Sequence, residues 1–231
     1  MATQITCTQN PEPLKWERVL QVFEIYLSIQ GESTHVGRPC VFVRLAACDL
    51  RCSWCDTPYA FTGGKKMSLD EVMAEVRALQ CHLVELTGGE PLLQKDAIPL
   101  MQRLCDEGFE VLIETGGHLP IHHLPQGVHA IMDVKCPGSG EAAKMHWPNL
   151  DVLSPDHEVK FVIKDRADYD YAREVVTTHQ LASKAGAVLL SPVHGVLAAE
   201  ELARWMLADH LPARLQVQTH KYIWSPETRG V

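Results

Sequence analysis

The chain has 231 residues, of which 46% are hydrophobic and 22% charged, and this composition is typical of a folded, single-domain globular protein. Its 29 acidic and 21 basic residues give a formal net charge of −8 at pH 7. That excess of negative charge argues against general binding to nucleic acid or to an anionic membrane. No apolar stretch approaches the roughly 20 residues of a membrane helix, and residues 1–16 lack a signal-peptide core. We therefore expect a cytoplasmic protein.

Residues 1–18 are interpreted as an N-terminal arm and residues 19–231 as a single domain. Eight short runs rich in aliphatic and β-branched residues predict strands. They are Val22–Ile29, Val41–Leu45, His82–Leu86, Glu110–Ile113, Ala130–Val134, Val159–Ile163, Ala187–Leu190 and Leu215–Thr219. Amphipathic patterns predict helices between several of them. These are Ser68 to about Leu79, with Glu71 completing a capping box, Ala97–Glu107, Asp168–His179 and Ala198–Ala208.

This alternation of strands and helices predicts an α/β fold with a mostly parallel sheet, either doubly wound or curled toward a barrel. Ligands then bind at the carboxyl ends of the strands. Polar residues do collect there. They are Arg44 and Cys48, Thr87–Pro91, Glu114–Gly117, Asp133–Lys135, Ser191–His194 and His220–Tyr222.

Three of the eight cysteines, Cys48, Cys52 and Cys55, lie within eight positions of a polar loop. In a reducing compartment such thiols are free for metal chemistry, and soft thiolates suit zinc or an iron–sulfur cluster. Structural zinc usually takes further ligands from a second Cys/His pair, but Cys40 and Cys81–His82 start strands at the opposite end. Three ligands on a four-iron cluster leave one iron open. We therefore favour a cluster over zinc, with chance clustering a distant third.

The pattern Cys48-x3-Cys52-x-Trp54-Cys55 resembles the signature of the radical S-adenosylmethionine (radical SAM) superfamily. Thr87-Gly88-Gly89-Glu90-Pro91 resembles the glycine-rich segment of the same superfamily, although two glycines alone also suit an ordinary βα turn. The resemblance implies a partial, open TIM-like (β/α) barrel. It also implies one 4Fe–4S cluster on the three cysteines and S-adenosylmethionine as cofactor.

From about Val22 to the C-terminus, further segments resemble the 7-carboxy-7-deazaguanine synthase family. They are Ser28–Ser33, Gly37–Pro39, Phe42–Arg44, Cys55–Thr57, Glu114–Gly117, Asp133–Gly140 and Gln218–Tyr222. The resemblance implies a lyase that uses S-adenosylmethionine and Mg²⁺ to convert 6-carboxy-5,6,7,8-tetrahydropterin to 7-carboxy-7-deazaguanine with loss of ammonia, in queuosine biosynthesis and tRNA modification. It also implies a homodimer and a reducing partner such as flavodoxin or ferredoxin.

The same resemblance assigns site residues. Substrate contacts are Ile29, Gln30, Gly31, Glu32, Arg44, Thr87 and His220. Contacts to S-adenosylmethionine are Trp54, Cys55, Asp56, Gly89, Glu114, Lys135, Ser139, Ser191, Pro192, Val193 and His194, and Thr57 is the Mg²⁺ ligand. No side chain is assigned as catalytic, because the radical is generated on the cofactor.

The residue types suit these roles, but each also has a structural interpretation. Gln30 offers both amide functions, and the planar fork of Arg44 matches a carboxylate, although Arg44 is equally suited to a surface salt bridge. The Thr57 hydroxyl suits Mg²⁺, yet it could simply cap the loop. Glu114 could be a helix cap or a solvated strand end, and Ser139 a turn residue.

Two other functions stay open. A different small radical SAM enzyme, such as an activase that makes a glycyl radical on a partner protein, would need room for a protein substrate. A zinc-stabilised binding protein without catalysis would be colourless and would contain stoichiometric zinc.

Overall fold

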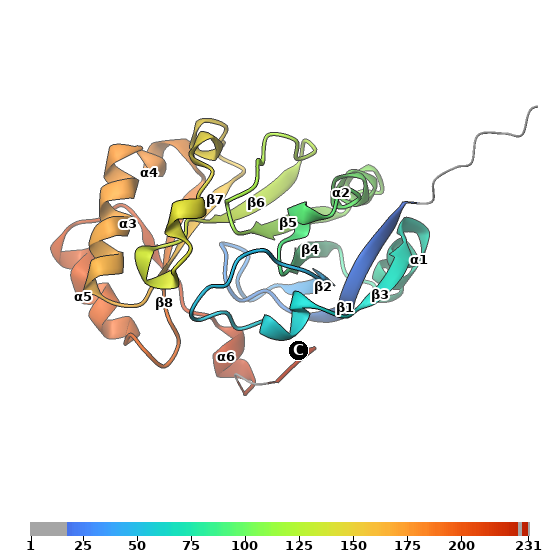
Figure 1. The fold of residues 1–231 in the computed structure, drawn as a ribbon, viewed down its shortest axis with the longest axis horizontal. Coiled ribbons are helices and arrows are strands. Elements are labelled where there is room, and N and C mark those ends of the chain that lie inside the picture. Colours follow the sequence, from blue (N-terminus) through green and yellow to red (C-terminus); the bar gives the residue numbers. More distant parts are fainter. Residues whose placement is uncertain (1–17, 226–227, 231) are drawn as a thin grey trace, which may run out of the picture.

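Nine strands form one twisted sheet in the computed structural model, which describes residues 18–225 and 228–230 (Figure 1). Their order is β3-β1-β2-β4-β5-β6-β7-β8-β9. The strands are β1 (Val19–Ile29), β2 (Pro39–Leu45), β3 (Lys65–Ser68), β4 (Leu83–Gly88), β5 (Glu110–Thr115), β6 (Val128–Asp133), β7 (Glu158–Ile163), β8 (Ala187–Pro192) and β9 (Arg214–Leu215). β1 is antiparallel to β2 and β3, whereas every later pair is parallel. The arm predicted for residues 1–18 lies outside the described residues except for Arg18.

The sheet stays open, because β3 and β9 stand at its two ends. This confirms the partial, open (β/α) barrel. The chain after β9 returns to the loop between β1 and β2, where the Thr219 amide donates to the Gly31 carbonyl at 3.1 Å. The same loop, residues 30–38, also contacts the parallel strands: Gln30 donates to Glu85 of β4, and Thr34 to Glu158 of β7. One loop therefore spans the inner side of the sheet.

Helices flank the two halves of the sheet and bury two apolar cores. They are α1 (Leu69–Ala78), α2 (Ala97–Asp106), α3 (Arg166–Thr178), α4 (Leu181–Lys184), α5 (Ala199–Ala208) and α6 (His220–Ile223). α1 and α2 pack with β1, β2, β4 and β5, and α3 and α5 with β7 and β8 (Figure 1). The predicted capping box at the start of α1 is present, since the Glu71 amide donates to the Ser68 hydroxyl and Glu71 accepts from the Ser68 amide.

One predicted strand is largely wrong. The run Leu215–Thr219 alternates like a strand, but β9 ends at Leu215 and Thr219 precedes α6. Gln216 instead turns inward and its side chain donates to carbonyls of Gly31 and Val217. The short elements β3, α4 and α6 were not predicted, because four residues carry too little periodicity to reveal them.

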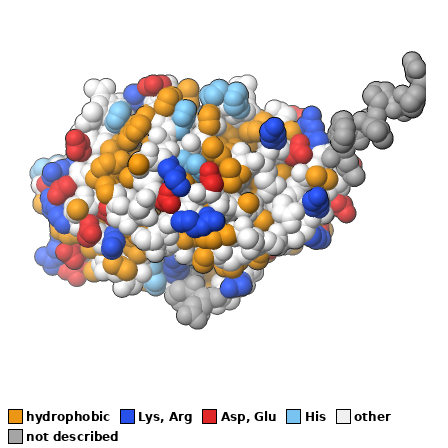
Figure 2. All heavy atoms as spheres, in the orientation of Figure 1, with side chains coloured by type: hydrophobic (Ala, Val, Ile, Leu, Met, Phe, Trp, Pro, Cys, Tyr) orange, Lys and Arg blue, Asp and Glu red, His pale blue; other side chains and the backbone are white. Residues whose placement is uncertain are grey.

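Within the described residues, no helix combines the length and apolarity that a bilayer span requires. On the face drawn in Figure 2, acidic and basic side chains are interspersed with apolar ones.

Candidate active site

A cavity of about 960 Å³ opens at the carboxyl ends of the parallel strands. It collects most of the residues that the sequence singled out. These are Ile29, Gln30, Glu32, Arg44, Cys48, Cys52, Trp54, Cys55, Asp56, Thr57, Thr87, Gly89, Glu114, Lys135, Val193, His194 and His220. The sequence stretches that supply them are far apart in the chain, so the fold brings one site together from nearly every strand end.

Four predicted site residues do not line this cavity. Gly31 is buried behind it, where a Cβ would meet the His220 ring at 2.7 Å. The Ser139 hydroxyl donates to the Cys136 carbonyl at 2.6 Å and accepts from the Glu141 amide. Ser139 therefore acts as a turn residue, the structural alternative considered for it from the sequence. Ser191 and Pro192 end the buried strand β8, and Pro192 faces a neighbouring pocket of about 390 Å³.

The cysteine loop is anchored from outside itself. The Ser53 amide donates to the Ser139 carbonyl at 3.0 Å, and the Arg51 amide donates to the Glu141 carboxylate at 2.7 Å. Cys55 closes a turn onto the Cys52 carbonyl at 3.1 Å. Burial raises the pKa of the Cys48 and Cys52 thiols above their ordinary value, and a bound metal would stabilise their thiolate form.

The donor set suits an iron–sulfur cluster, because soft thiolates are the ligands that such a cluster takes. All three cysteines line the same cavity. The residues present therefore fit a 4Fe–4S cluster.

The glycine segment packs against the backbone that leads into the cysteine loop. A Cβ on Gly88 would lie 2.2 Å from the Leu45 carbonyl oxygen, and one on Gly89 would lie 2.1 Å from that of Ala47. Gly88 also has a φ of +146°, which favours glycine. These two glycines therefore set the position of the loop.

Glu90, which the sequence analysis did not single out, joins two strand ends. Its buried carboxylate accepts from the Leu92 amide, the Gly116 amide at 2.7 Å and the Thr115 hydroxyl at 2.9 Å. It thus ties the end of β4 to the end of β5. A glutamate directly before a proline that opens a short helix, here Pro91–Leu93, was the available signal.

A buried charge network centres on Lys160 of β7. Its ammonium lies 3.0 Å from Glu32 and 3.2 Å from Glu114. Burial acts to raise the pKa of Glu32, but Lys160 and His220 outweigh it and lower this pKa to about 2. Burial raises the pKa of Glu114 to about 6 despite Lys160. Glu114 is therefore part of an ion-paired network rather than a solvated strand end.

Glu85 of β4 is a buried carboxyl of this region, with 1% of its surface exposed. Burial raises its pKa well above the usual value, and nearby Glu114 adds to the rise. Neither Glu85 nor Lys160 was predicted as a site residue. A charged residue inside an otherwise apolar strand was the signal in both cases.

Gln30 is more constrained than the sequence suggested. Its amide oxygen accepts from the amides of Glu32 and Ser33 at 3.2 Å, and its NH₂ group donates to Glu85. The expectation that both amide functions are free for a ligand is therefore wrong. The side chain shapes the loop that presents Glu32, whose carboxylate also accepts from Gln218 at 3.0 Å.

Arg44 is inside the cavity, with 12% of its side chain exposed, so it is not a surface salt bridge. Its Nε donates to Glu24 at 2.8 Å and its Nη2 to the Tyr26 hydroxyl at 2.7 Å. Glu24 is the cross-strand partner of Arg44, and that register was not visible in the sequence. Among the described residues no partner is seen for Nη1, which leaves one arm of the fork for a ligand.

Thr57 precedes the short helix Pro58–Phe61 without capping it through its side chain. Its hydroxyl lies 3.9 Å from the Cys55 sulfur. Next to it, Asp56, Glu32 and His220 place their ligand atoms within 4.8 Å of one another. Oxygen ligands for a cation are thus available beside the cysteine loop. Lys135, predicted to contact S-adenosylmethionine, pairs with Asp133 at 2.6 Å.

Together, the open (β/α) barrel and the three-cysteine loop define a radical SAM protein, and residues 43–191 match the radical SAM superfamily. Within it, the chain belongs to the 7-carboxy-7-deazaguanine synthase family. It is 51% identical over 226 residues to the 7-carboxy-7-deazaguanine synthase of Koribacter versatilis, with 92% of this chain and 100% of the relative covered. The synthase of Chlorobaculum tepidum is 45% identical over 218 residues, with 93% and 99% covered.

The fold has a counterpart among solved structures. QueE from Escherichia coli superimposes with a TM-score of 0.70 at 21% identity, over 87% of this chain and 94% of that one. As a member of the radical SAM superfamily, the chain is an enzyme that uses a 4Fe–4S cluster and S-adenosylmethionine.

Proposed function

We propose that the chain is a 7-carboxy-7-deazaguanine synthase, converting 6-carboxy-5,6,7,8-tetrahydropterin to 7-carboxy-7-deazaguanine with loss of ammonia, as a step of queuosine biosynthesis. The observation that carries this proposal is one cavity that holds the three-cysteine loop, Arg44 and the Lys160 network together. The identity of 51% over the full length of a synthase supports the same assignment.

Cys48, Cys52 and Cys55 would hold the cluster, which when bound would supply the electron for reductive cleavage of S-adenosylmethionine. Trp54, Asp56, Gly89, Glu114, Lys135, Val193 and His194 would surround that cofactor from the same cavity. Ser139, Ser191 and Pro192 would support this region only through the backbone, because their side chains are occupied or buried elsewhere.

The substrate is a flat heterocycle with one carboxylate and several N–H groups. Arg44 would bind the carboxylate through Nη1, while Glu24 and Tyr26 hold the rest of its fork in place. Glu32, with its pKa held near 2, is charged at neutral pH and would accept from the ring N–H groups. Thr87 and His220 would complete the contacts, and Ile29 would pack against the ring.

Thr57 would bind Mg²⁺ together with the substrate carboxylate. Magnesium prefers oxygen ligands and keeps several waters, so one hydroxyl and one substrate oxygen suffice on the protein side. The absence of a side-chain cap at Thr57 supports this role, since the hydroxyl is not used by its own helix.

The family membership argues against the two alternative functions, an activase for a partner protein and a zinc-stabilised binding protein. We further propose a homodimer, a reducing partner such as flavodoxin or ferredoxin and a cytoplasmic location. The free thiols and an oxygen-sensitive cluster suit such a reducing compartment.

Anaerobic assay of the reconstituted protein with S-adenosylmethionine, Mg²⁺, a reductant and the carboxytetrahydropterin tests the function. We expect the deazaguanine chromophore to appear together with deoxyadenosine. If deoxyadenosine forms but the pterin is recovered unchanged, the chain is a radical SAM enzyme for another substrate and the proposal is wrong.

A further inference from the structure

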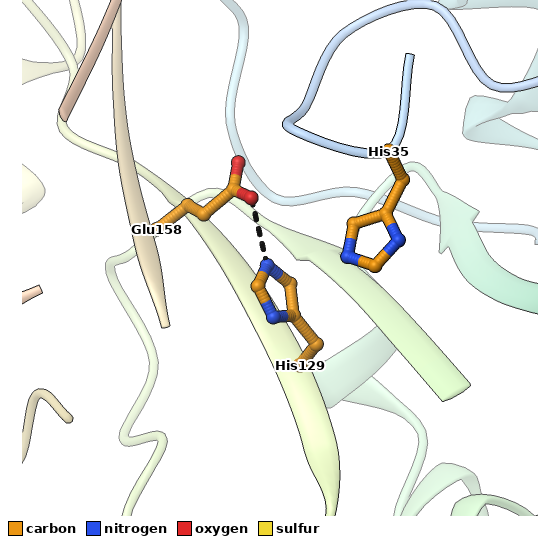
Figure 3. A group of neighbouring side chains, drawn as sticks. All are labelled: His35, His129 and Glu158. Atoms are coloured by element: carbon orange, nitrogen blue, oxygen red, sulfur yellow. Dashed lines mark hydrogen bonds and ion pairs between the residues drawn. The ribbon is translucent and has the colours of Figure 1, made fainter. Parts of the chain in front are cut away.

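Beneath the cavity, three side chains from separate parts of the chain converge on one point. His35 comes from the loop between β1 and β2, His129 is the second residue of β6, and Glu158 is the first residue of β7 (Figure 3). Their ligand atoms all lie within 4.8 Å of one another. None of the three lines the cavity that holds the cysteines.

The position of this cluster follows from strand geometry. Glu158 and Lys160 are two residues apart on β7, so their side chains point to the same face of the sheet. On this face Lys160 forms ion pairs with Glu32 and Glu114, and Glu158 lies two residues nearer the amino end of β7. The cluster therefore forms a separate polar layer below the floor of the cavity, at the amino ends of the strands.

We propose that His35, His129 and Glu158 form a zinc site that fastens the loop between β1 and β2 to the amino ends of β6 and β7. Two imidazoles and one carboxylate, with water as the fourth ligand, form a donor set that zinc accepts readily. This site is independent of the proposed function.

The two imidazoles present suitable nitrogens. The Nε2 of His129 is 2.9 Å from Glu158 Oε1. The Nδ1 of His35 contacts Arg38 and Glu110, so the nitrogen that Figure 3 shows turned toward the other two side chains is Nε2. Ligand atoms around tetrahedral zinc are separated by roughly 3.3 Å, given Zn–N and Zn–O bonds near 2.0–2.1 Å. A small outward shift of His129 would therefore admit the ion.

The surroundings already orient these ligands. Glu158 has 1% of its side chain exposed and accepts from both the amide and the hydroxyl of Thr34. Glu110 lies 3.3 Å from the His35 Nδ1 and can accept its proton when Nε2 binds metal. Such outer carboxylate partners are usual for histidine ligands of zinc.

The charge of the cluster also suits a cation. Glu158 contributes a carboxylate, whose Oε1 lies 2.9 Å from the His129 Nε2. Arg38 is the nearby opposing charge; it is paired with both oxygens of Glu110, and 45% of its side chain is exposed, so it can swing away.

Occupation of this site would act on the cavity through one loop. The loop of residues 30–38 contains both the cavity residues Gln30 and Glu32 and, three residues after Glu32, His35. The Gly37 amide closes this loop by donating to the Gln30 carbonyl at 2.9 Å. A metal at His35 would thus stiffen the segment that presents Glu32 to the cavity.

Zinc content of the cluster-loaded protein tests the site, because the cluster keeps Cys48, Cys52 and Cys55 from binding zinc. Anaerobic protein stripped with a chelator is dialysed against buffered free zinc, and zinc and iron are then measured per chain. We expect about one zinc per wild-type chain and at least tenfold weaker zinc binding in His129→Gln, with iron unchanged.

Two further variants keep the test decisive. His35→Gln lies in a loop and should lose zinc in the same way if His129→Gln folds poorly, whereas His122→Gln, an exposed histidine outside the cluster, should retain it. Zinc should also slow amide hydrogen exchange over residues 30–38 in wild type but not in His35→Gln. No zinc in the wild type, or equal zinc in all four proteins, overturns the proposal.

Discussion

The Glu90 amide donates to the Ala47 carbonyl at 2.8 Å and so joins the glycine segment to the residue directly before Cys48. The Gly89 amide makes a parallel bond to the Leu45 carbonyl at 3.1 Å. The two signature segments are therefore one packed unit. Displacing either backbone displaces the first cysteine.

Gly89→Ala should therefore reduce cluster binding. Its methyl group would meet the Ala47 carbonyl oxygen at 2.1 Å, so the backbone before Cys48 must move. We expect a clear loss of iron per folded chain after anaerobic reconstitution. Gly186→Ala is the matched control, because its Cβ would meet the Pro155 carbonyl oxygen at the same 2.1 Å, away from the cavity. That control should lose stability but keep its iron, and equal iron in both variants would contradict the idea.

Replacing Cys48, Cys52 or Cys55 singly with Ala should abolish both cluster binding and cleavage of S-adenosylmethionine, because two thiolates are too few to retain the cluster. Iron analysis and deoxyadenosine formation measure the two effects. Cys105→Ala, in α2 on the opposite side of the apolar core, should leave both almost unchanged. A Cys52→Ala protein with full iron and full activity would remove Cys52 from the site.

Arg44→Lys should weaken substrate binding far more than it weakens binding of S-adenosylmethionine. A lysine cannot hold Glu24 and Tyr26 while also reaching the substrate carboxylate, as the arginine fork does. We expect a loss on the order of 1.5–3 kcal/mol, or about tenfold to a hundredfold in Kd for the pterin. Titrations with each ligand measure this, with the exposed Arg77→Lys as control. Equal losses for both ligands would place Arg44 elsewhere.

Thr57→Ala should reduce the response of turnover to Mg²⁺, because in the proposed function Thr57 would hold the ion that positions the substrate carboxylate. Removal of Mg²⁺ should slow formation of deazaguanine much more than formation of deoxyadenosine. Ser53→Ala is the control, since the Ser53 hydroxyl donates to the Gly138 carbonyl at 2.8 Å instead. Identical Mg²⁺ curves for wild type and Thr57→Ala would exclude Thr57 as a ligand.

Lys160→Met should destabilise the fold by about 3 kcal/mol at pH 7, because it leaves the part-buried carboxylates of Glu32 and Glu114 without their buried cation. Lys65→Met, at an exposed ion pair with Glu75, should cost less than about 1 kcal/mol. Urea unfolding measures both differences.

The difference in free energy of unfolding between wild type and Lys160→Met should become smaller as the pH falls. In wild type the pKa of Glu32 is lowered to about 2, so its contribution to stability is present above about pH 4.5 and is lost as the pH falls toward 2. The variant lacks this contribution. Protonation of Glu32 and Glu114 in the variant removes the destabilisation that comes from holding two charges without a cation. If this difference in free energy of unfolding stays constant or increases from pH 7 to pH 4, Lys160 does not stabilise the fold through its pairing with Glu32 and Glu114.

The sequence alone determined the features that depend on neighbours along the chain. The three-cysteine spacing, the strand cores from Val41 to Leu190 and the capping box of Ser68 and Glu71 all follow from local periodicity or from motifs of a few residues. These features depend on interactions between residues that are close together in the chain, so they can be recognised from the sequence. The resemblance to the synthase family depends on the same local segments.

Only the tertiary structure decided which side chains are free to act. The Arg44 guanidinium donates to Glu24 because β1 and β2 pair in a particular register. The Gln30 side-chain amide donates to Glu85 because the loop between β1 and β2 crosses the sheet. Lys160 and the His35, His129 and Glu158 cluster likewise join residues more than 20 positions apart. Such contacts depend on register and on loop path, and neither leaves a periodic trace in the sequence.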